Sequence, residues 1–179
     1  MPVTPIHCSV AYLARALRPR LSLPALLVST MAPDLEIPFL YVFTGGQYSR
    51  LALHSLLGAV TLAALLSVLL TVFAYSPVVS RLFNIDYQTV KGKCRFSWSL
   101  TAVCVVGGLS HAFVDSLHHE YNPLLFPFTY DSFDALVLMN NWTFASVIVS
   151  ILFLSLLFLF VAKEVKRGTE NIWNRLLVE

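Results

Sequence analysis

A histidine and an aspartate four residues apart offer the clearest chemistry in this sequence. His111 and Asp115 lie in the stretch 107–120, and on a helix this spacing places both side chains on one face. His118 and His119 continue the same stripe one turn later. An imidazole and a carboxylate held in this way form a bidentate platform for a divalent metal ion. A hydrogen-bonded His–Asp pair at a helix end is the alternative, but ionisable groups at membrane depth are expensive and usually functional.

Four other ionisable residues are candidates because their surroundings are apolar. Asp34 and Glu36 lie between the runs LLVSTM and IPFLYVF, which contain no Lys or Arg. A buried carboxylate needs a cation, and a metal ion would supply the missing charge. His54 begins a long apolar run and His7 lies in the opening segment. Each of these two histidines, taken alone, is as well explained by an interfacial or structural position.

Together these side chains predict a metal centre of one or two ions. Imidazoles and carboxylates suit Zn²⁺, with Mn²⁺ or Fe²⁺ as alternatives, better than Cu(I). The candidates exceed one tetrahedral site, and paired metals are a common device for hydrolysing phosphate esters, so Asp115 is a candidate bridge between two ions. The predicted metal ligands are His7, Asp34, His54, His111 and Asp115. Residues predicted to orient those ligands or to transfer protons in catalysis are Glu36, His118, His119 and Glu120.

The composition requires a lipid bilayer as part of the solvent. Of the 179 residues, 57% are hydrophobic and 12% are charged, and the mean hydropathy is +0.73. The basic residues form no stripe, so a nucleic-acid partner is not expected. The three cysteines have no CxxC spacing, and a Cys94–Cys104 disulfide is not expected. We predict an all-α fold with one integral-membrane helical domain over residues 1–179.

Apolar runs predict a polytopic bundle of about four to five helices. Uninterrupted runs long enough to cross a bilayer occupy residues 52–75, 96–117 and 143–162. Residues 21–43 are also long enough, but prolines interrupt them. Because Pro33 disfavours helix in the residue before it, we predict a helix ending near Ala32, a turn and a membrane-hugging segment.

The remaining segments are predicted to lie at or near the membrane surfaces. Residues 4–17 predict a shorter amphipathic or half-spanning helix. The aromatic stretch 121–141 is expected to lie at the outer interface. Residues 168–179 have apolar residues at the spacing of one helix face, which predicts an amphipathic cytoplasmic tail on the membrane surface. The opening MPVTPIHCSV lacks the basic-then-apolar order of a signal peptide, and no cleavable one is expected.

The distribution of basic residues predicts the orientation. Eleven of the twelve Lys and Arg residues fall in the segments around 15–20, 81–95 and 163–175, and only Arg50 falls on the other side. The positive-inside rule then gives an outside N-terminus and a cytoplasmic C-terminus. All five histidines fall on the outer side, so the metal centre is expected to face outside.

The motifs resemble those of the YdjM-like membrane-bound metal-dependent hydrolases of bacteria and archaea. The likeness rests on the opening MPVTPIH, the Pro33–Glu36 segment, the helix start at 50–55, the Gly107–Asp115 motif and the NPLLFPF turn. The resemblance implies location in the plasma (inner) membrane of a bacterium or archaeon. It also implies a distant similarity to zinc-dependent phospholipase C and the related single-strand-specific nucleases. Those enzymes use a His, an Asp, a His and a His-x-x-x-Asp in the chain order of His7, Asp34, His54, His111 and Asp115.

The sequence departs from the family pattern at three places. Ser49 stands where the family often has a histidine, Glu36 stands where an aspartate is usual, and nothing after Glu120 supplies a further His-x-x-x-acid motif. One metal site is therefore better supported than a second or third. His54, His111, Asp34 and Asp115 are the expected ligands of that site, and His7 would join a second ion.

Three functions are compatible with this pattern. The first is an integral-membrane metal-dependent hydrolase acting on phosphoester bonds in a membrane lipid or lipid-linked substrate at the outer face. The second is a non-enzymatic membrane protein with a structural metal or polar cluster. A small metal or proton transporter is the third, but transporters place ionisable residues near the midplane and on both halves of the path. The confinement of these residues to one end argues against transport.

Overall fold

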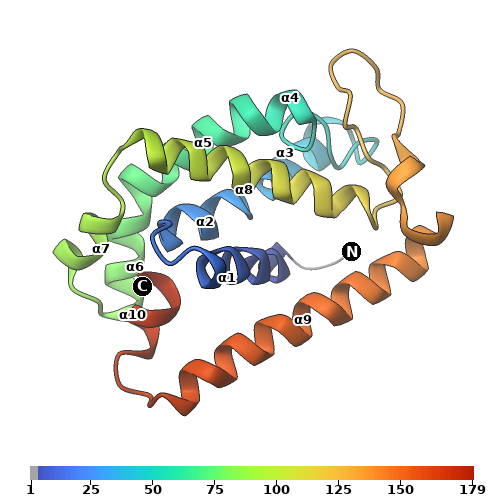
Figure 1. The fold of residues 1–179 in the computed structure, drawn as a ribbon. Helices are drawn as coiled ribbons and strands as arrows, with labels where there is room; N and C mark the ends of the chain where they lie inside the picture. Colours follow the sequence, from blue (N-terminus) through green and yellow to red (C-terminus); the bar gives the residue numbers. More distant parts are fainter. Residues whose placement is uncertain (1–3) are drawn as a thin grey trace.

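The computed structural model describes residues 4–179 and is a bundle of helices (Figure 1). No β-strand occurs in this part of the chain, which confirms the all-α prediction. Its helices with the length and composition of membrane spans are Leu56–Phe83 (α4 to α6), Trp98–Ser116 (α8) and Trp142–Lys166 (α9). The pair Leu23–Ser29 (α2) and Ala32–Phe43 (η2 and α3) passes the same test as one broken span, bent by 44°.

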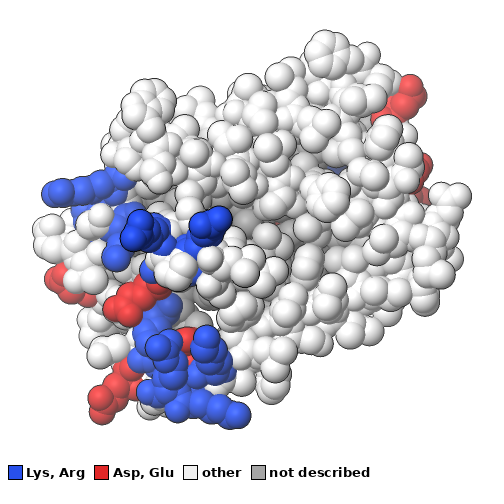
Figure 2. Space-filling view, viewed as in Figure 1, with Lys and Arg blue, Asp and Glu red and all other residues white. Residues whose placement is uncertain are grey.

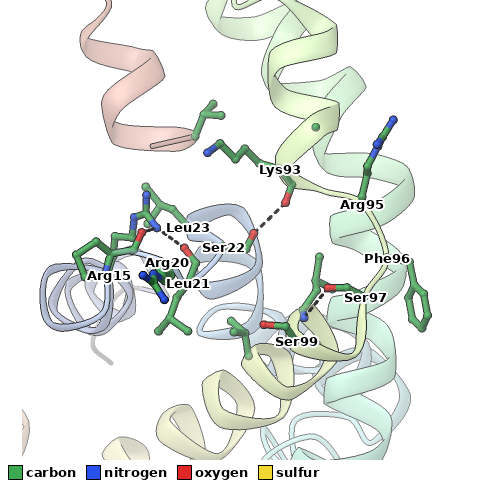
Figure 3. Close-up of a pocket in the computed structure, with 15 residues that line it drawn as sticks. Arg15, Arg20, Leu21, Ser22, Leu23, Lys93, Arg95, Phe96, Ser97 and Ser99 are labelled. Atoms are coloured by element: carbon green, nitrogen blue, oxygen red, sulfur yellow. Dashed lines mark hydrogen bonds between the residues drawn. The ribbon is translucent and has the colours of Figure 1, made fainter.

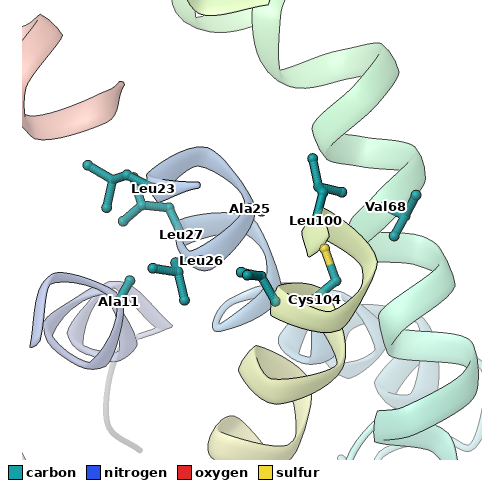
Figure 4. Packing of buried hydrophobic residues seen from close by; sticks show 9 residues of the cluster. Ala11, Leu23, Ala25, Leu26, Leu27, Val68, Leu100 and Cys104 are labelled. Carbon is teal, nitrogen blue, oxygen red and sulfur yellow. The ribbon is translucent and has the colours of Figure 1, made fainter. Parts of the chain in front are cut away.

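The core lies where α2 packs between Cys8–Leu17 (α1), the Leu56–Phe83 helix and α8 (Figure 4). It contains Leu26 and Leu27 of α2 together with Val68 of α5 and Leu100 of α8. Two adjacent glycines let the helices approach closely. A Cβ on Gly107 would lie 1.8 Å from Ser29 Oγ, and a Cβ on Gly108 would lie 2.9 Å from the Ala59 carbonyl oxygen. Small residues at such contacts are the usual device for packing membrane helices.

The three uninterrupted spans agree with the sequence prediction, with one extension. The first span begins at Leu56 instead of 52 and continues through Pro77 to Phe83. Two π-helical segments, Ala59–Ala63 and Leu70–Tyr75, interrupt its α-helical hydrogen bonding. The cytoplasmic connection expected from residue 76 is therefore a helical extension followed by Tyr87–Lys93 (α7).

The broken segment 21–43 also follows the prediction in outline. Ser22 caps α2 by accepting from the Ala25 amide, and α2 ends at Ser29, a few residues before the expected Ala32. The short 3-10 helix η2 (Ala32–Leu35) makes the turn that carries Asp34. The segment after the turn is the helix α3 (Glu36–Phe43), which has no buried residue.

The C-terminal tail differs from its sequence prediction. Its helix α10 (Ile172–Leu177) turns back onto the bundle. The C-terminal segment after α9 lies beside α6 and α7 (Figure 1). Leu176 and Val178 are buried, and Trp173 stacks on Phe83 with ring centroids 4.8 Å apart. The hydroxyl of Tyr75 donates to the Leu177 carbonyl at 2.7 Å. Part of the predicted apolar face therefore packs on protein, while Trp173 remains 50% exposed.

The charged residues are strongly polarised along the bundle. Lys and Arg side chains gather at the end formed by α6, α7, α10 and the end of α9 (Figure 2). A pocket of about 440 Å³ at this end is lined by Arg15, Arg20, Lys93 and Arg95 among others (Figure 3). Its lining contains no His, Asp, Glu or Cys, so it offers no metal-ligand set. Cys8, Cys94 and Cys104 are free thiols, as expected.

We expect residues 84–97 to face the cytoplasm and residues 118–141 to face outside. Single cysteines replacing the exposed residues Gln88 and Asp131, with the native cysteines removed, test this in intact cells. A membrane-impermeant thiol reagent applied outside should label position 131 and spare position 88, because the basic end should face the cytoplasm. Labelling of position 88 alone would mean that the orientation is reversed.

Candidate metal centre

Four side chains from three helical regions meet at the end of the bundle opposite the basic residues. Asp34 comes from η2, His54 from the turn before α4, and His111 and Asp115 from α8. The Nε2 atoms of His54 and His111 are 3.3 Å apart. Asp34 Oδ1 lies 3.4 Å from His54 Nε2 and 3.5 Å from His111 Nε2. Asp115 Oδ2 lies 3.5 Å from His54 Nε2 and 3.4 Å from His111 Nε2.

Hydrogen bonds on the opposite ring nitrogens fix both imidazoles. His54 Nδ1 donates to Glu36 Oε1 at 2.7 Å. Glu36 is itself held, because its Oε1 accepts from the Leu51 amide at 2.8 Å and its Oε2 from the Leu53 amide at 2.9 Å. His111 Nδ1 donates to the Thr30 carbonyl at 2.8 Å. When both rings are neutral with the proton on Nδ1, each Nε2 presents a lone pair to the centre of the cluster.

The separations fit the ligand shell of a tetrahedral metal ion. Ligand bonds of 2.0–2.1 Å place the corners of a tetrahedron about 3.3–3.4 Å apart, and the five measured separations among these atoms are 3.3–3.5 Å. Two lone pairs facing each other in a buried site, with two carboxylates beside them, repel unless a cation lies between them. The Asp34, His54, His111 and Asp115 group could therefore hold a metal ion, and we call it the four-residue centre.

A second group of possible ligands shares Asp115. Its members are Asp115, His118 and His119. Asp115 Oδ1 points away from the four-residue centre and has no hydrogen-bond partner, although His7 Nε2 lies 3.3 Å from it. His118 Nδ1 donates to the Val114 carbonyl at 2.7 Å, and its buried Nε2 is also without a partner. Unpartnered buried polar atoms are costly and indicate a place for an ion or a water molecule.

Burial keeps the histidines of the second group in the form that can bind a metal. The loss of hydration on burial lowers the pKa of His118 to about 4, and burial also lowers the pKa of His119. Both rings are therefore neutral at neutral pH. His7 completes this side of the site, since its ring stacks on His111 with centroids 4.2 Å apart.

Arg50 is the one cation that the sequence places near these carboxylates, and the structure identifies the residues that it contacts. Its side chain is 7% exposed, its Nε donates to Asp115 Oδ2 at 3.2 Å, and its Nη2 donates to His119 Nε2 at 3.2 Å. The site has three carboxylates, those of Asp34, Glu36 and Asp115, against this one guanidinium. Two negative charges remain when the imidazoles are neutral, which is the charge that a divalent ion balances. The available signal was topological, because Arg50 is the one basic residue that the charge partition places outside.

A recess of about 180 Å³ lies at the surface beside His119. Glu120, Asp134 and Trp142 also line this recess. Glu120 is exposed and belongs to neither of the ligand groups, so the structure separates it from the buried cluster. Asn122 is buried and donates from Nδ2 to the His119 carbonyl at 2.9 Å, which holds the turn after α8 in place.

Nearly all of the described chain matches one known family. The model of the family described as YdjM inner membrane protein matches residues 4–177. The chain belongs to this family. Comparisons with curated proteins and with solved structures found no match. Membership confirms the family part of the sequence resemblance, and it identifies the chain as an inner membrane protein. The relationship to metal-dependent hydrolases and to phospholipase C stays a prediction.

The four-residue centre of this family member can be tested by metal content. We expect His111→Ala to lower bound zinc well below the wild-type level, because one imidazole nitrogen is lost from four ligands. Asp115→Ala should be at least as severe, because both ligand groups share this carboxylate. His118→Ala should be milder. The measurement is metal per protein by elemental analysis, with Asp131→Ala, an exposed carboxylate far along the loop, as the matched control. Equal metal content in all variants would show that these residues do not form a metal centre.

Glu36 is expected to act on the metal through His54. Glu36→Gln keeps the length of the side chain and loses the anionic partner of His54 Nδ1, so zinc affinity should fall about 10–100-fold. Competition titration against a chromogenic chelator measures this affinity. Glu120→Gln is the control, since Glu120 is exposed and has no contact with His54, and its affinity should equal that of wild type. Unchanged affinity in Glu36→Gln would show that Glu36 does not support the centre.

Proposed function

We propose that this protein is an integral-membrane, zinc-dependent hydrolase that cleaves phosphoester bonds in a lipid or lipid-linked substrate at the outer face of the membrane. The observation that carries the proposal is the tetrahedral spacing of donor atoms from Asp34, His54, His111 and Asp115. Two nitrogen and two oxygen donors at this spacing favour zinc over manganese, which prefers six oxygen-rich ligands. The membrane location follows from the family and the apolar spans.

The chain's own residues supply the groups that such a reaction needs. A divalent ion held at the four-residue centre would act as a Lewis acid toward a phosphoryl oxygen. Glu36 keeps the His54 ring in the orientation and tautomer required of a ligand. The Arg50 guanidinium lies beside Asp115 and His119, where it could pair with a second phosphate oxygen.

Proton transfer is assigned to the recess. In the overall reaction the oxygen of a water molecule forms a new bond to phosphorus, and the ester oxygen leaves and takes up a proton. Glu120 and His119 line the recess at the surface beside the second ligand group. We assign Glu120 to pass the proton released by the attacking water on to solvent, because it is exposed and lines the recess beside His119.

A structural metal clip is the competing function. It is favoured by the burial of His54 and His111, whose side chains are 1% and 0% exposed. The recess beside His119 and the unpartnered Nε2 of His118 favour the enzyme, since a structural site is closed and a catalytic site keeps an open position.

Hydrolysis of defined lipids by the purified protein tests the proposal. Phosphatidic acid, phosphatidylglycerol and an isoprenoid diphosphate are presented in detergent micelles, and released phosphate and headgroup are measured. We expect hydrolysis of at least one of them to disappear after chelation, to return with zinc, and to be lost in Asp34→Asn. Asp131→Asn is the control and should retain activity. A zinc-loaded protein that hydrolyses none of the three would instead support the structural clip.

A further inference from the structure

A groove of about 400 Å³ on the side of the bundle leads away from Asp34. One wall is formed by Val28, Met31 and Leu35 of the broken span, and the other by Leu70, Ala74 and Val78 of the long helix. Asp34 is the one charged residue in the lining. The same carboxylate places Oδ1 3.4 Å from His54 Nε2, so the groove begins at the metal centre.

The position of the groove identifies the kind of molecule that fills it. Both walls belong to segments with the length and composition of membrane spans, so the groove opens to the hydrocarbon of the bilayer. No water-filled route is needed for an aliphatic group to enter it. From Leu70 to Val78 the wall is about 12 Å long at the helical rise of 1.5 Å per residue. One leaflet of a bilayer has a hydrocarbon depth of about 15 Å, so the wall accommodates most of one lipid tail.

The polarity of the two ends sets the direction of the bound lipid. Asp34 and the ligands lie at one end, while the groove continues toward the basic end of the bundle, along the part of the helix that leads to Arg81. Tyr75 also lines the groove, and its hydroxyl already donates a hydrogen bond to the Leu177 carbonyl. This hydroxyl is therefore not available to a lipid headgroup. A lipid with its headgroup at Asp34 and its tail along the apolar walls matches the polarity of both ends of the groove.

We propose that this groove binds the hydrocarbon tail of the lipid substrate and delivers its phosphoester to the four-residue centre from within the bilayer. The proposal rests on the proposed function, because it identifies the tail as the part of the substrate recognised beside the metal. The recess at His119 lies outside the groove lining and would give water a separate approach. Lipid and water therefore approach the site from different directions.

Photocrosslinking tests the groove by a measurement that does not depend on hydrolysis. Phosphatidic acid with a diazirine in its acyl chain is bound to the zinc-loaded protein in nanodiscs, and crosslinked peptides are mapped by mass spectrometry. We expect crosslinks concentrated in 28–35 and 70–78. Helix α9, which is broadly exposed to lipid, provides the comparison for unselective contact. Equal labelling of α9 and of the groove peptides would overturn the proposal.

Substitutions that fill the groove supply the matched comparison. Ala74→Phe and Val78→Trp each add a bulky side chain to the wall, and Leu65→Phe adds one to an exposed position on the same helix outside the groove. Groove crosslinking should fall severalfold in the first two variants and stay unchanged in Leu65→Phe, with zinc content equal in all. Val78→Trp is included because Val78 is half exposed and its replacement should not disturb folding. If groove crosslinking in Ala74→Phe and Val78→Trp equals that in Leu65→Phe, the proposal that the groove binds the lipid tail is overturned.

The two proposals fail in different ways. Crosslinks confined to the groove without hydrolysis of any lipid would leave the groove standing and overturn the phosphoesterase. Hydrolysis with crosslinks spread evenly over the spans would overturn the groove and leave the phosphoesterase standing.

Discussion

Two imidazole nitrogens face each other across 3.3 Å at one end of the bundle, and both rings are held so that the lone pairs of their neutral forms point inward. Without a cation between them this arrangement is electrostatically unfavourable, and the low dielectric of a membrane bundle makes the repulsion stronger. Carboxylates from Asp34 and Asp115 close the remaining corners and add negative charge. The surrounding hydrogen bonds thus orient four possible ligand atoms toward one point. A positive ion bound there would relieve the repulsion among them.

The helices make this geometry possible by ending or bending at the same level. The close approach of α2 and α8 at Gly107 brings the Thr30 carbonyl to His111, and the bend after α2 turns Asp34 toward the same ring. Free backbone amides at the start of the next span hold Glu36, which in turn holds His54. Backbone groups that an uninterrupted helix would pair internally are used here to position side chains. The broken span is therefore a structural requirement of the site, since a straight helix would leave neither the turn at Asp34 nor the anchor at Glu36.

The sequence predicted the parts of this site that follow from helical periodicity and from burial. His111 and Asp115 could be found because a spacing of four places them on one face, and Asp34 and Glu36 because carboxylates in an apolar run demand a counter-charge. The spans were found because their length and hydropathy are fixed by the bilayer. The partners of the ligands were not predictable, because the Thr30 carbonyl and the Leu51 and Leu53 amides are backbone groups with no residue-type signal. The packing of the C-terminal tail was not predictable for a related reason. An apolar helix face has the same sequence pattern whether it contacts lipid or, as Leu176 does, protein.

Arg50 shows how a topological outlier can carry chemical information. Arg50 lies at the opposite end from the other eleven basic residues and contributes nothing to the orientation that they favour. Its burial against Asp115 and His119 costs desolvation energy. That cost is offset where the guanidinium balances part of the negative charge of the carboxylates. With neutral imidazoles, the three carboxylates and one guanidinium leave two negative charges, which one divalent ion could neutralise. A second arginine or lysine beside these carboxylates would neutralise the negative charge that a divalent ion could otherwise balance.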